Sequence, residues 1–149
     1  MNLQNMKEEK IIIKNKKEMA DFAAKLAKQA KIGDIIGLKG TLGAGKSFFA
    51  RSFINALSQE PQDVLSPTFN LLYSYNTQKG EIFHFDLYRL KSADELENIG
   101  FFDALQNGIS LIEWPEIAKS FLKKNYLEIE IKIIGKEEEE REIIYKLWR

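Results

Sequence analysis

The strongest constraint on the fold comes from residues 40–47, which read GTLGAGKS and fit the pattern G-x-x-x-x-G-K-S/T at every fixed position. Such a loop must turn its backbone N–H groups inward on phosphate oxygens, and glycine allows this because no side chain blocks the approach. Residues 33–39 read as a short buried strand, and residues 46–57 have apolar side chains at helical spacing. Because strand, loop and helix follow in the order of a phosphate-binding loop, we expect an α/β fold.

The loop predicts a site for a nucleoside triphosphate and Mg²⁺. We expect the Lys46 ammonium to reach the β- and γ-phosphates and the Ser47 hydroxyl to ligate Mg²⁺. The helix that follows Gly45 directs the positive end of its dipole at the same phosphates. The guanine-specific N-K-x-D signature is absent from the sequence, which favours ATP over GTP.

Composition restricts the class of protein. A chain of 149 residues predicts a single domain over residues 1–149, and the absence of cysteine fits a reducing compartment. The 22 basic and 22 acidic residues cancel, which argues against tight direct binding of RNA. Residues 1–13 carry charges where a signal peptide needs an apolar run, and no stretch approaches the ~20 apolar residues of a membrane span. We therefore expect a cytoplasmic protein that does not enter a membrane.

The rest of the chain alternates between strand-like and helix-like segments. Strands are expected at 10–14, 33–39, 69–75, 81–88, 109–112, 126–134 and 142–148, and helices at 16–30, 46–57, 92–100 and 115–122. Two pairs of these strands read as β-hairpins and must contribute antiparallel neighbours. The expected fold class is therefore α/β, a P-loop NTPase-like mixed sheet with helices on both faces and a C-terminal β-hairpin.

Two acidic residues are candidates to complete the site. A P-loop needs further acids to hold Mg²⁺ and to orient the attacking water, usually at the carboxyl ends of neighbouring strands. Glu113 ends the apolar strand 109–112, and Asp86 shares a strand face with His84. Both acids are interpreted as site residues rather than as exposed ion-pair partners. His84 is predicted to be a half-buried, hydrogen-bonded ring, whereas Trp114 fits a nucleotide contact and a core position equally well.

The combination of motifs resembles the TsaE family, formerly called YjeE, the small bacterial ATPases of the tRNA threonylcarbamoyladenosine pathway. The resemblance covers about residues 10–148 and is far more specific than a P-loop alone. Its motifs are GTLGAGKS at 40–47, SPTF at 66–69, HFDLYR at 84–89, EL at 95–96 followed by IG at 99–100, and EWP at 113–115.

The resemblance implies an ATPase that is weak alone and works with two partner proteins, TsaB and TsaD. These attach a threonylcarbamoyl group to the adenosine beside the anticodon in tRNAs that read codons beginning with A. ATP hydrolysis is expected to reset the TsaB–TsaD complex between cycles. The chain would therefore act on tRNA only indirectly, through that complex.

The resemblance also implies roles for individual residues. Residues 66–69 would form a switch-like loop that responds to the γ-phosphate, and Met19 stands where the family often has a threonine near the nucleotide. Three side chains would be catalytic, namely Lys46, Asp86 and Glu113. Mg²⁺ would be held by Ser47 and Glu113, and the nucleotide contacts would be Gly43, Ala44, Gly45, Lys46, Ser47, Phe48, Trp114 and Glu116.

Two alternatives belong to other functional classes. A nucleotide-gated binding module would use ATP only to set a docking surface. A small-molecule kinase would need an arginine-bearing lid over its acceptor, and the four arginines, at 51, 89, 141 and 149, are not clustered. The same spacing places no arginine in the P-loop or beside Glu113, which predicts that no arginine finger acts in cis.

Overall fold

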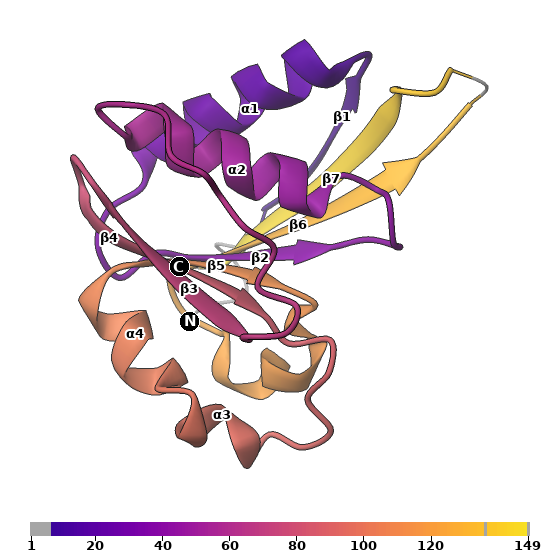
Figure 1. The fold of residues 1–149 in the computed structure, drawn as a ribbon. Helices are drawn as coiled ribbons and strands as arrows, with labels where there is room; N and C mark the ends of the chain where they lie inside the picture. The colour runs from indigo at the N-terminus through magenta and orange to yellow at the C-terminus, as the bar shows by residue number, and fades with distance from the viewer. Residues whose placement is uncertain (1–6, 136, 149) are drawn as a thin grey trace.

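The computed structural model describes residues 7–135 and 137–148, and their strands form one seven-stranded sheet in the order β1-β7-β6-β2-β5-β4-β3 (Figure 1). Arg149 and the first six residues of the segment 1–13, which the sequence analysis compared with a signal peptide, lie outside the described residues. The strands are β1 (Lys7–Ile13), β2 (Ile35–Lys39), β3 (Leu72–Thr77), β4 (Gly80–Asp86), β5 (Ile109–Glu113), β6 (Tyr126–Ile133) and β7 (Arg141–Trp148).

The sheet is mixed, as the two expected hairpins require. Strand β2 runs parallel to both neighbours, β5 and β6, and β4 is parallel to β5. The hairpins β3–β4 and β6–β7 are antiparallel, and β1 adds to β7 in the same sense. The strand that enters the P-loop therefore lies inside the sheet, where pairing on both sides fixes the position at which the loop begins.

Helices cover both faces of the sheet, which confirms the predicted fold class. Helices α1 (Lys16–Gln29) and α2 (Lys46–Leu57) lie on one face, where Phe49, Phe53 and Ile54 are fully buried. The other face carries α3 (Glu95–Asn98), α4 (Phe101–Asn107) and the 3₁₀ helix η2 (Pro115–Phe121). Among the described residues, no helix has the length and apolar character needed to cross a bilayer.

Several segments differ from expectation, each for a local reason. The strand expected from residue 69 begins at Leu72, because Phe69 lies in a turn and is 82% exposed. The helix expected at 92–100 is only α3, and Gly100 precedes α4, which the sequence analysis missed. Gly100 has φ +75°, a conformation typical of a helix end, but it here separates two short helices. The segment expected as a helix at 115–122 is the 3₁₀ helix η2.

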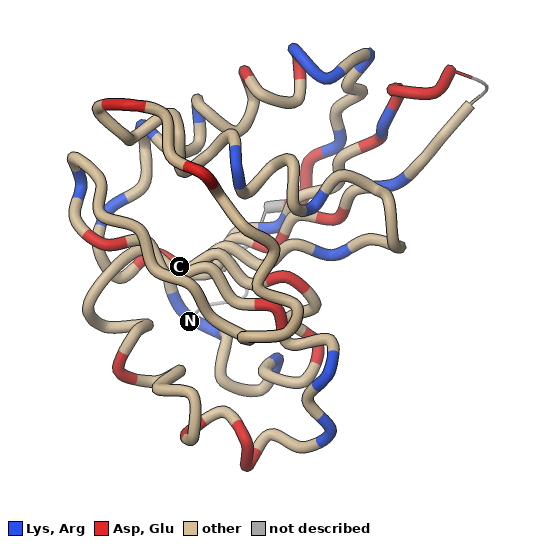
Figure 2. The backbone as a smooth tube through the Cα atoms, viewed as in Figure 1, with Lys and Arg blue, Asp and Glu red and all other residues tan. Residues whose placement is uncertain are grey.

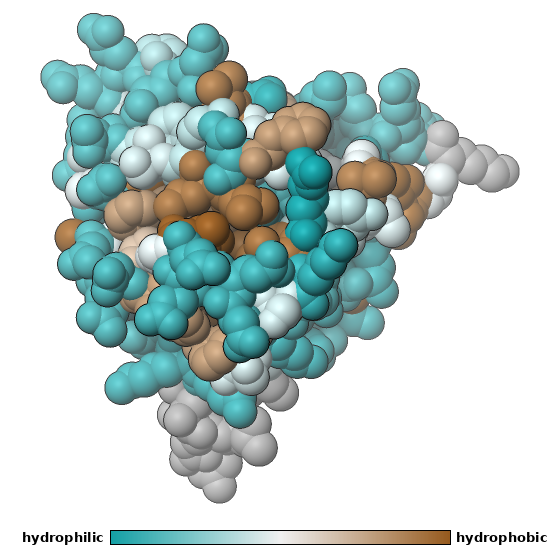
Figure 3. Space-filling model, turned by 60° about the horizontal axis from the view of Figure 1, so that its bottom comes forward, coloured by the Kyte–Doolittle hydropathy of each residue, from teal (hydrophilic) through white to brown (hydrophobic). Residues whose placement is uncertain are grey.

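One face of the molecule gathers exposed apolar side chains. Figure 3, in which the bottom of Figure 1 is turned forward, shows hydrophobic residues in the middle of this face and hydrophilic residues around them. Exposed large hydrophobic side chains of the helices on this side include Phe102 of α4 and Phe121 of η2, whose ring centroids are 5.1 Å apart.

Candidate active site

The P-loop connects β2 to α2 through a backbone path that two of its glycines make possible. At Gly40, a Cβ atom would come within 2.6 Å of the Ile131 carbonyl oxygen, so any side chain would clash with the neighbouring strand. Gly45 has φ +120°, a left-handed conformation that L-residues rarely adopt. The first turn of α2 follows at once, with Phe49 N–H donating to the Gly45 carbonyl at 2.9 Å. The N-terminus of α2 therefore faces the space enclosed by the loop.

Lys46 is buried at the base of this loop, with 5% of the residue exposed. Its ammonium donates to the carbonyl oxygens of Gly40 at 2.6 Å and Thr41 at 2.9 Å, and lies 4.2 Å from the centre of the Trp114 ring. Burial lowers the pKa of the Lys46 ammonium, while the negative charges of Glu113 and Asp86 act in the opposite direction. A cation held only by neutral carbonyls and a ring face is suited to exchange these partners for phosphate oxygens.

Glu113 lies at the end of β5 and is buried, with 3% of the residue exposed. Its carboxylate has two side-chain partners. Ser47 Oγ donates to it, 3.2 Å from both carboxylate oxygens, and His84 Nε2 lies 2.7 Å from Oε2. Because an ionised carboxylate only accepts, His84 Nε2 carries the proton of this hydrogen bond. The Nδ1 atom of His84 is buried without a hydrogen-bond partner among the described residues.

His84 is therefore hydrogen-bonded as predicted, but it is fully buried, at 1% exposed, rather than half-buried. The reason lies in the sheet. Strand β4 has neighbours on both sides, and Ile82, on the same face of β4 as His84, belongs to the buried cluster that includes Phe49 and Phe53 of α2. Alternation along a single strand identifies which residues share a face but not what covers that face.

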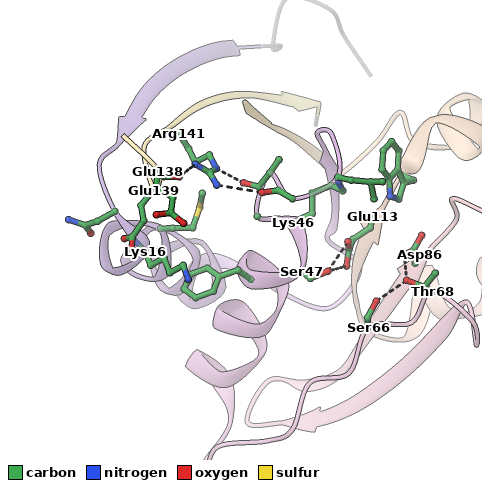
Figure 4. Close-up of a pocket in the computed structure, with 18 residues that line it drawn as sticks. Lys16, Lys46, Ser47, Ser66, Thr68, Asp86, Glu113, Glu138, Glu139 and Arg141 are labelled. Atoms are coloured by element: carbon green, nitrogen blue, oxygen red, sulfur yellow. Dashed lines mark hydrogen bonds between the residues drawn. The ribbon is translucent and has the colours of Figure 1, made fainter. Parts of the chain in front are cut away.

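Asp86 lies beside Glu113 because the two residues are paired in the register of the parallel strands β4 and β5. One carboxylate oxygen accepts from Thr68 Oγ1 at 3.1 Å, and the other accepts from the Tyr88 N–H at 3.0 Å. Thr68 in turn shares a hydrogen bond of 2.8 Å with Ser66 Oγ. The loop 66–69 is thus hydrogen-bonded through Thr68 to Asp86, an acid at the edge of the P-loop site (Figure 4).

These elements enclose a cleft of about 520 Å³, within the range of about 300–1,000 Å³ typical of small-molecule sites. Glu116 does not line this cleft and instead borders a separate cavity with Tyr126 and Trp148. Burial raises the pKa of the Glu116 carboxyl, with Lys39 opposing the shift. The cleft is lined by Asn15, Lys16, Met19, Leu42, Gly43, Ala44, Gly45, Lys46, Ser47, Phe48, Ser66, Thr68, Asp86, Glu113, Trp114, Glu138, Glu139 and Arg141.

Trp114 is part of the cleft wall rather than of the core. Its backbone is left-handed at φ +57°, and its N–H donates to the Leu38 carbonyl at 3.2 Å. The ring packs against Tyr88, with centroids 4.7 Å apart, and faces the Lys46 ammonium. Of the two interpretations that the sequence left open, the structure supports a position beside the phosphate-binding loop.

Sequence reasoning missed the third wall of the cleft. Asn15 and Lys16 at the start of α1, together with Glu138, Glu139 and Arg141 of the β6–β7 hairpin, border the P-loop on the side away from Asp86 (Figure 4). The sequence places no arginine within the P-loop or beside Glu113, yet Arg141 contacts the loop from the far end of the chain. Its partners are backbone carbonyls, so the prediction that no arginine finger acts in cis stays a prediction. No local pattern signals this contact, since it depends on the pairing of β7 between β1 and β6.

The side chains at the base of the cleft fit Mg²⁺. The Ser47 hydroxyl and the Glu113 carboxylate lie within hydrogen-bond distance of one another and offer oxygen atoms only. Mg²⁺ prefers oxygen ligands and is commonly held by one or two protein groups together with water and substrate phosphates. Ser47 and Glu113 are thus the residues that would hold the ion.

Comparison with known proteins identifies the family. The family model described as "Threonylcarbamoyl adenosine biosynthesis protein TsaE" matches residues 13–143, which is most of the chain. The chain belongs to the TsaE family. It is 43% identical over 122 residues to the tRNA threonylcarbamoyladenosine biosynthesis protein TsaE of Rickettsia prowazekii, covering 82% of this chain and 85% of that protein.

Two further comparisons are with a Bacillus subtilis relative and with a solved structure. The TsaE protein of Bacillus subtilis is 36% identical over 132 residues, covering 88% of this chain and 80% of the relative. The crystal structure of Bacillus subtilis YdiB superposes with a TM-score of 0.76 at 32% identity, covering 97% of this chain and 88% of that chain. These comparisons support membership of the TsaE family, which is described by tRNA threonylcarbamoyladenosine biosynthesis, and the P-loop is consistent with ATP binding.

Proposed function

We propose that this chain is a single-domain, cytoplasmic, Mg²⁺-dependent ATP hydrolase that acts on a complex of TsaB and TsaD. Its hydrolysis would support attachment of a threonylcarbamoyl group to the adenosine beside the anticodon in tRNAs that read codons beginning with A. The observation that carries the proposal is the buried carboxylate of Glu113, which bonds Ser47 of the P-loop at the base of the cleft. Acidic residues are rarely buried without a partner, because burial of their charge is costly. A role in phosphate chemistry therefore explains a buried acid beside the P-loop better than a contribution to stability does.

The phosphates of ATP would lie against the P-loop. Lys46 would move from the Gly40 and Thr41 carbonyls to the β- and γ-phosphate oxygens, a short movement because the loop surrounds its ammonium. The backbone of Gly43, Ala44 and Gly45 and the start of α2, with Ser47 and Phe48, would complete the cradle. Mg²⁺, when bound, neutralises negative charge that develops on the phosphate oxygens.

Asp86 would orient the attacking water. Its carboxylate is 5% exposed and lies beside Glu113 in the sheet register, so its position is set by two paired strands rather than by a loop. Thr68 holds one of its oxygens, and a bound γ-phosphate would compete for the same loop. This arrangement supports a coupling between nucleotide state and the conformation of residues 66–69.

The surroundings of the cleft support docking to a partner. Leu42 at the P-loop, Phe69 after Thr68 and Tyr88 after Asp86 are 74%, 82% and 57% exposed. Of these three, Leu42 lines the cleft, and Phe69 and Tyr88 are close in sequence to the lining residues Thr68 and Asp86. Exposed apolar side chains beside a site are typical of interaction surfaces. Because Phe69 belongs to the loop that bonds Asp86, a change at the γ-phosphate would alter the surface offered to a partner. The same contacts support the alternative of a nucleotide-gated binding module.

Turnover and docking measurements together separate these functions. We expect ATP hydrolysis to be slow for the purified chain and to rise when TsaB and TsaD are added, with a non-hydrolysable ATP analogue promoting binding to the pair more strongly than ADP. Both the slow turnover alone and the preference for the ATP analogue follow if the loop 66–69 closes over the site only when the γ-phosphate and the partner are both present. Nucleotide-dependent docking without any hydrolysis would identify a binding module, and equal docking with fast turnover in isolation would identify an autonomous ATPase.

His84 is expected to hold Glu113 in position. Replacing His84 by phenylalanine removes the 2.7 Å hydrogen bond and leaves the carboxylate with one partner fewer, so we expect turnover to fall about 10- to 100-fold, as for other residues that orient a metal ligand. Glutamine at the same position retains a donor close to where His84 Nε2 lies and should recover part of the rate. The measurement is the Mg²⁺ dependence of ATP hydrolysis with partners present; equal rates for the two variants would contradict this role.

A further inference from the structure

Arg141, the first residue of β7, contacts two other segments of the chain through its guanidinium. Its Nε donates to the Ala44 carbonyl at 2.7 Å, and Nη2 lies 3.5 Å from the Gly43 carbonyl. Nη1 donates to the carbonyls of Glu138 and Glu140 at 2.8 and 2.9 Å. All four partners are backbone oxygens, so the planar fork of the guanidinium joins the P-loop to the β6–β7 hairpin (Figure 4).

The strands hold Arg141 firmly in place. Arg141 pairs with Ile13 of β1 on one side and with Ile133 of β6 on the other. The hairpin is also fastened to α1, because Glu139 Oε1 accepts from the Lys16 N–H at 3.0 Å. Figure 2 shows the acidic residues of this hairpin lying near the basic residues at the start of α1. Arg141 therefore contacts the P-loop from an anchored position.

The contact with Arg141 fixes the orientation of one peptide unit of the P-loop. A trans peptide unit holds its C=O and N–H on opposite sides, so fixing the Ala44 carbonyl toward Arg141 fixes the Gly45 N–H toward the opposite side. Lys46 binds the carbonyls of Gly40 and Thr41, but it must leave them to bind phosphate. Arg141 is the cation that continues to hold the loop when Lys46 turns to the nucleotide.

We propose that Arg141 is a positioning residue of the nucleotide site, which presets the Gly43–Gly45 backbone for the phosphates through the Ala44 carbonyl. This role rests on the proposed binding of ATP. It also assigns the guanidinium to backbone carbonyls and not to the γ-phosphate, so Arg141 is no substitute for an arginine finger. Because the Gly43–Gly45 backbone contacts the α- and β-phosphates in P-loops, Arg141 supports ATP and ADP equally.

The test compares three variants of the full chain. R141Q removes the charge and the fork. R141K keeps the charge but loses the planar fork, so its single ammonium cannot reach the P-loop carbonyls and the hairpin carbonyls together. R51Q is the matched control. Arg51 is an exposed residue of α2 with no hydrogen bond among those of the described part of the chain. Affinities for ATP and ADP are measured by calorimetry, KM and kcat are measured with TsaB and TsaD present, and hydrogen exchange of the P-loop peptide is measured without nucleotide.

For R141Q we expect both affinities to fall about tenfold, the effect of one charge-assisted hydrogen bond, with KM raised and kcat within about twofold of the unmodified chain. We expect R141K to lose most of the same affinity, the P-loop peptide to exchange faster in both variants, and R51Q to match the unmodified chain.

R141Q affinities equal to those of R51Q would overturn the role. Full affinity in R141K would also overturn it, because the effect would then depend on charge alone. If R141Q does not fold, R141K decides. An unmodified chain that binds no ATP would refute the proposed function, and the exchange measurement would still test Arg141.

Discussion

Replacing Glu113 by glutamine is expected to lower ATP turnover on the order of 100-fold while ATP binding without metal stays nearly unchanged. Glutamine has almost the same shape as glutamate, so the buried space at the end of β5 remains filled. The substitution removes the negative charge that accepts from Ser47 and His84, and it places an NH₂ donor where both neighbours also donate. The P-loop would still bind the phosphates, because its backbone is not altered.

The measurement is the rate of ATP hydrolysis with TsaB and TsaD present, beside calorimetry of ATP binding. Glu97→Gln is a matched control, since Glu97 is an exposed residue of α3 on the opposite face from the P-loop helix. Turnover at the unmodified rate in the Glu113 variant would show that Glu113 does not hold the metal ion. The Tm of both variants should be recorded, because an unfolded Glu113 variant would lose binding as well.

Replacing Lys46 by alanine is expected to lower nucleotide affinity at least about tenfold, or about 1.4 kcal/mol. Lys46 is the buried cation that lies between the P-loop carbonyls, the Trp114 ring and the acids Glu113 and Asp86. Without it, the anionic phosphates would enter a site that keeps the two buried carboxylates but has lost the ammonium beside the P-loop carbonyls. The fold should persist, because alanine is a good residue for the first turn of α2.

Calorimetry with ATP and with ADP checks this second result. Lys25→Ala is a suitable control, because Lys25 is exposed on α1 and is not among the cleft-lining residues. Unchanged ATP affinity in the Lys46 variant would remove the P-loop assignment, and with it the proposed function. A loss of affinity in both variants would indicate a general effect of charge instead.

The sequence alone predicted the parts of the fold that depend on local order. The strand–loop–helix unit around residues 40–47 and the two hairpins lie in the structure as expected, because short-range turns and periodicity specify them. The position of Glu113 at the end of its strand was also predictable, since it follows an apolar run. Asp86 was predicted within a strand at 81–88, whereas β4 ends at Asp86. The helix α4 was missed because a glycine at residue 100 is compatible both with the end of one helix and with the start of the next.

Only the tertiary structure decided which of these parts meet. The strand order places β5 between β2 and β4, and this brings Glu113 to Ser47, His84 and Asp86. The same order inserts β7 between β1 and β6, and this carries Arg141 to the Ala44 carbonyl across 97 positions of sequence. Local patterns are set by neighbours along the chain, whereas strand pairing depends on which distant surfaces bury the most apolar area together. For this reason the P-loop could be identified from eight residues, while the arginine that holds it became visible only in the folded chain.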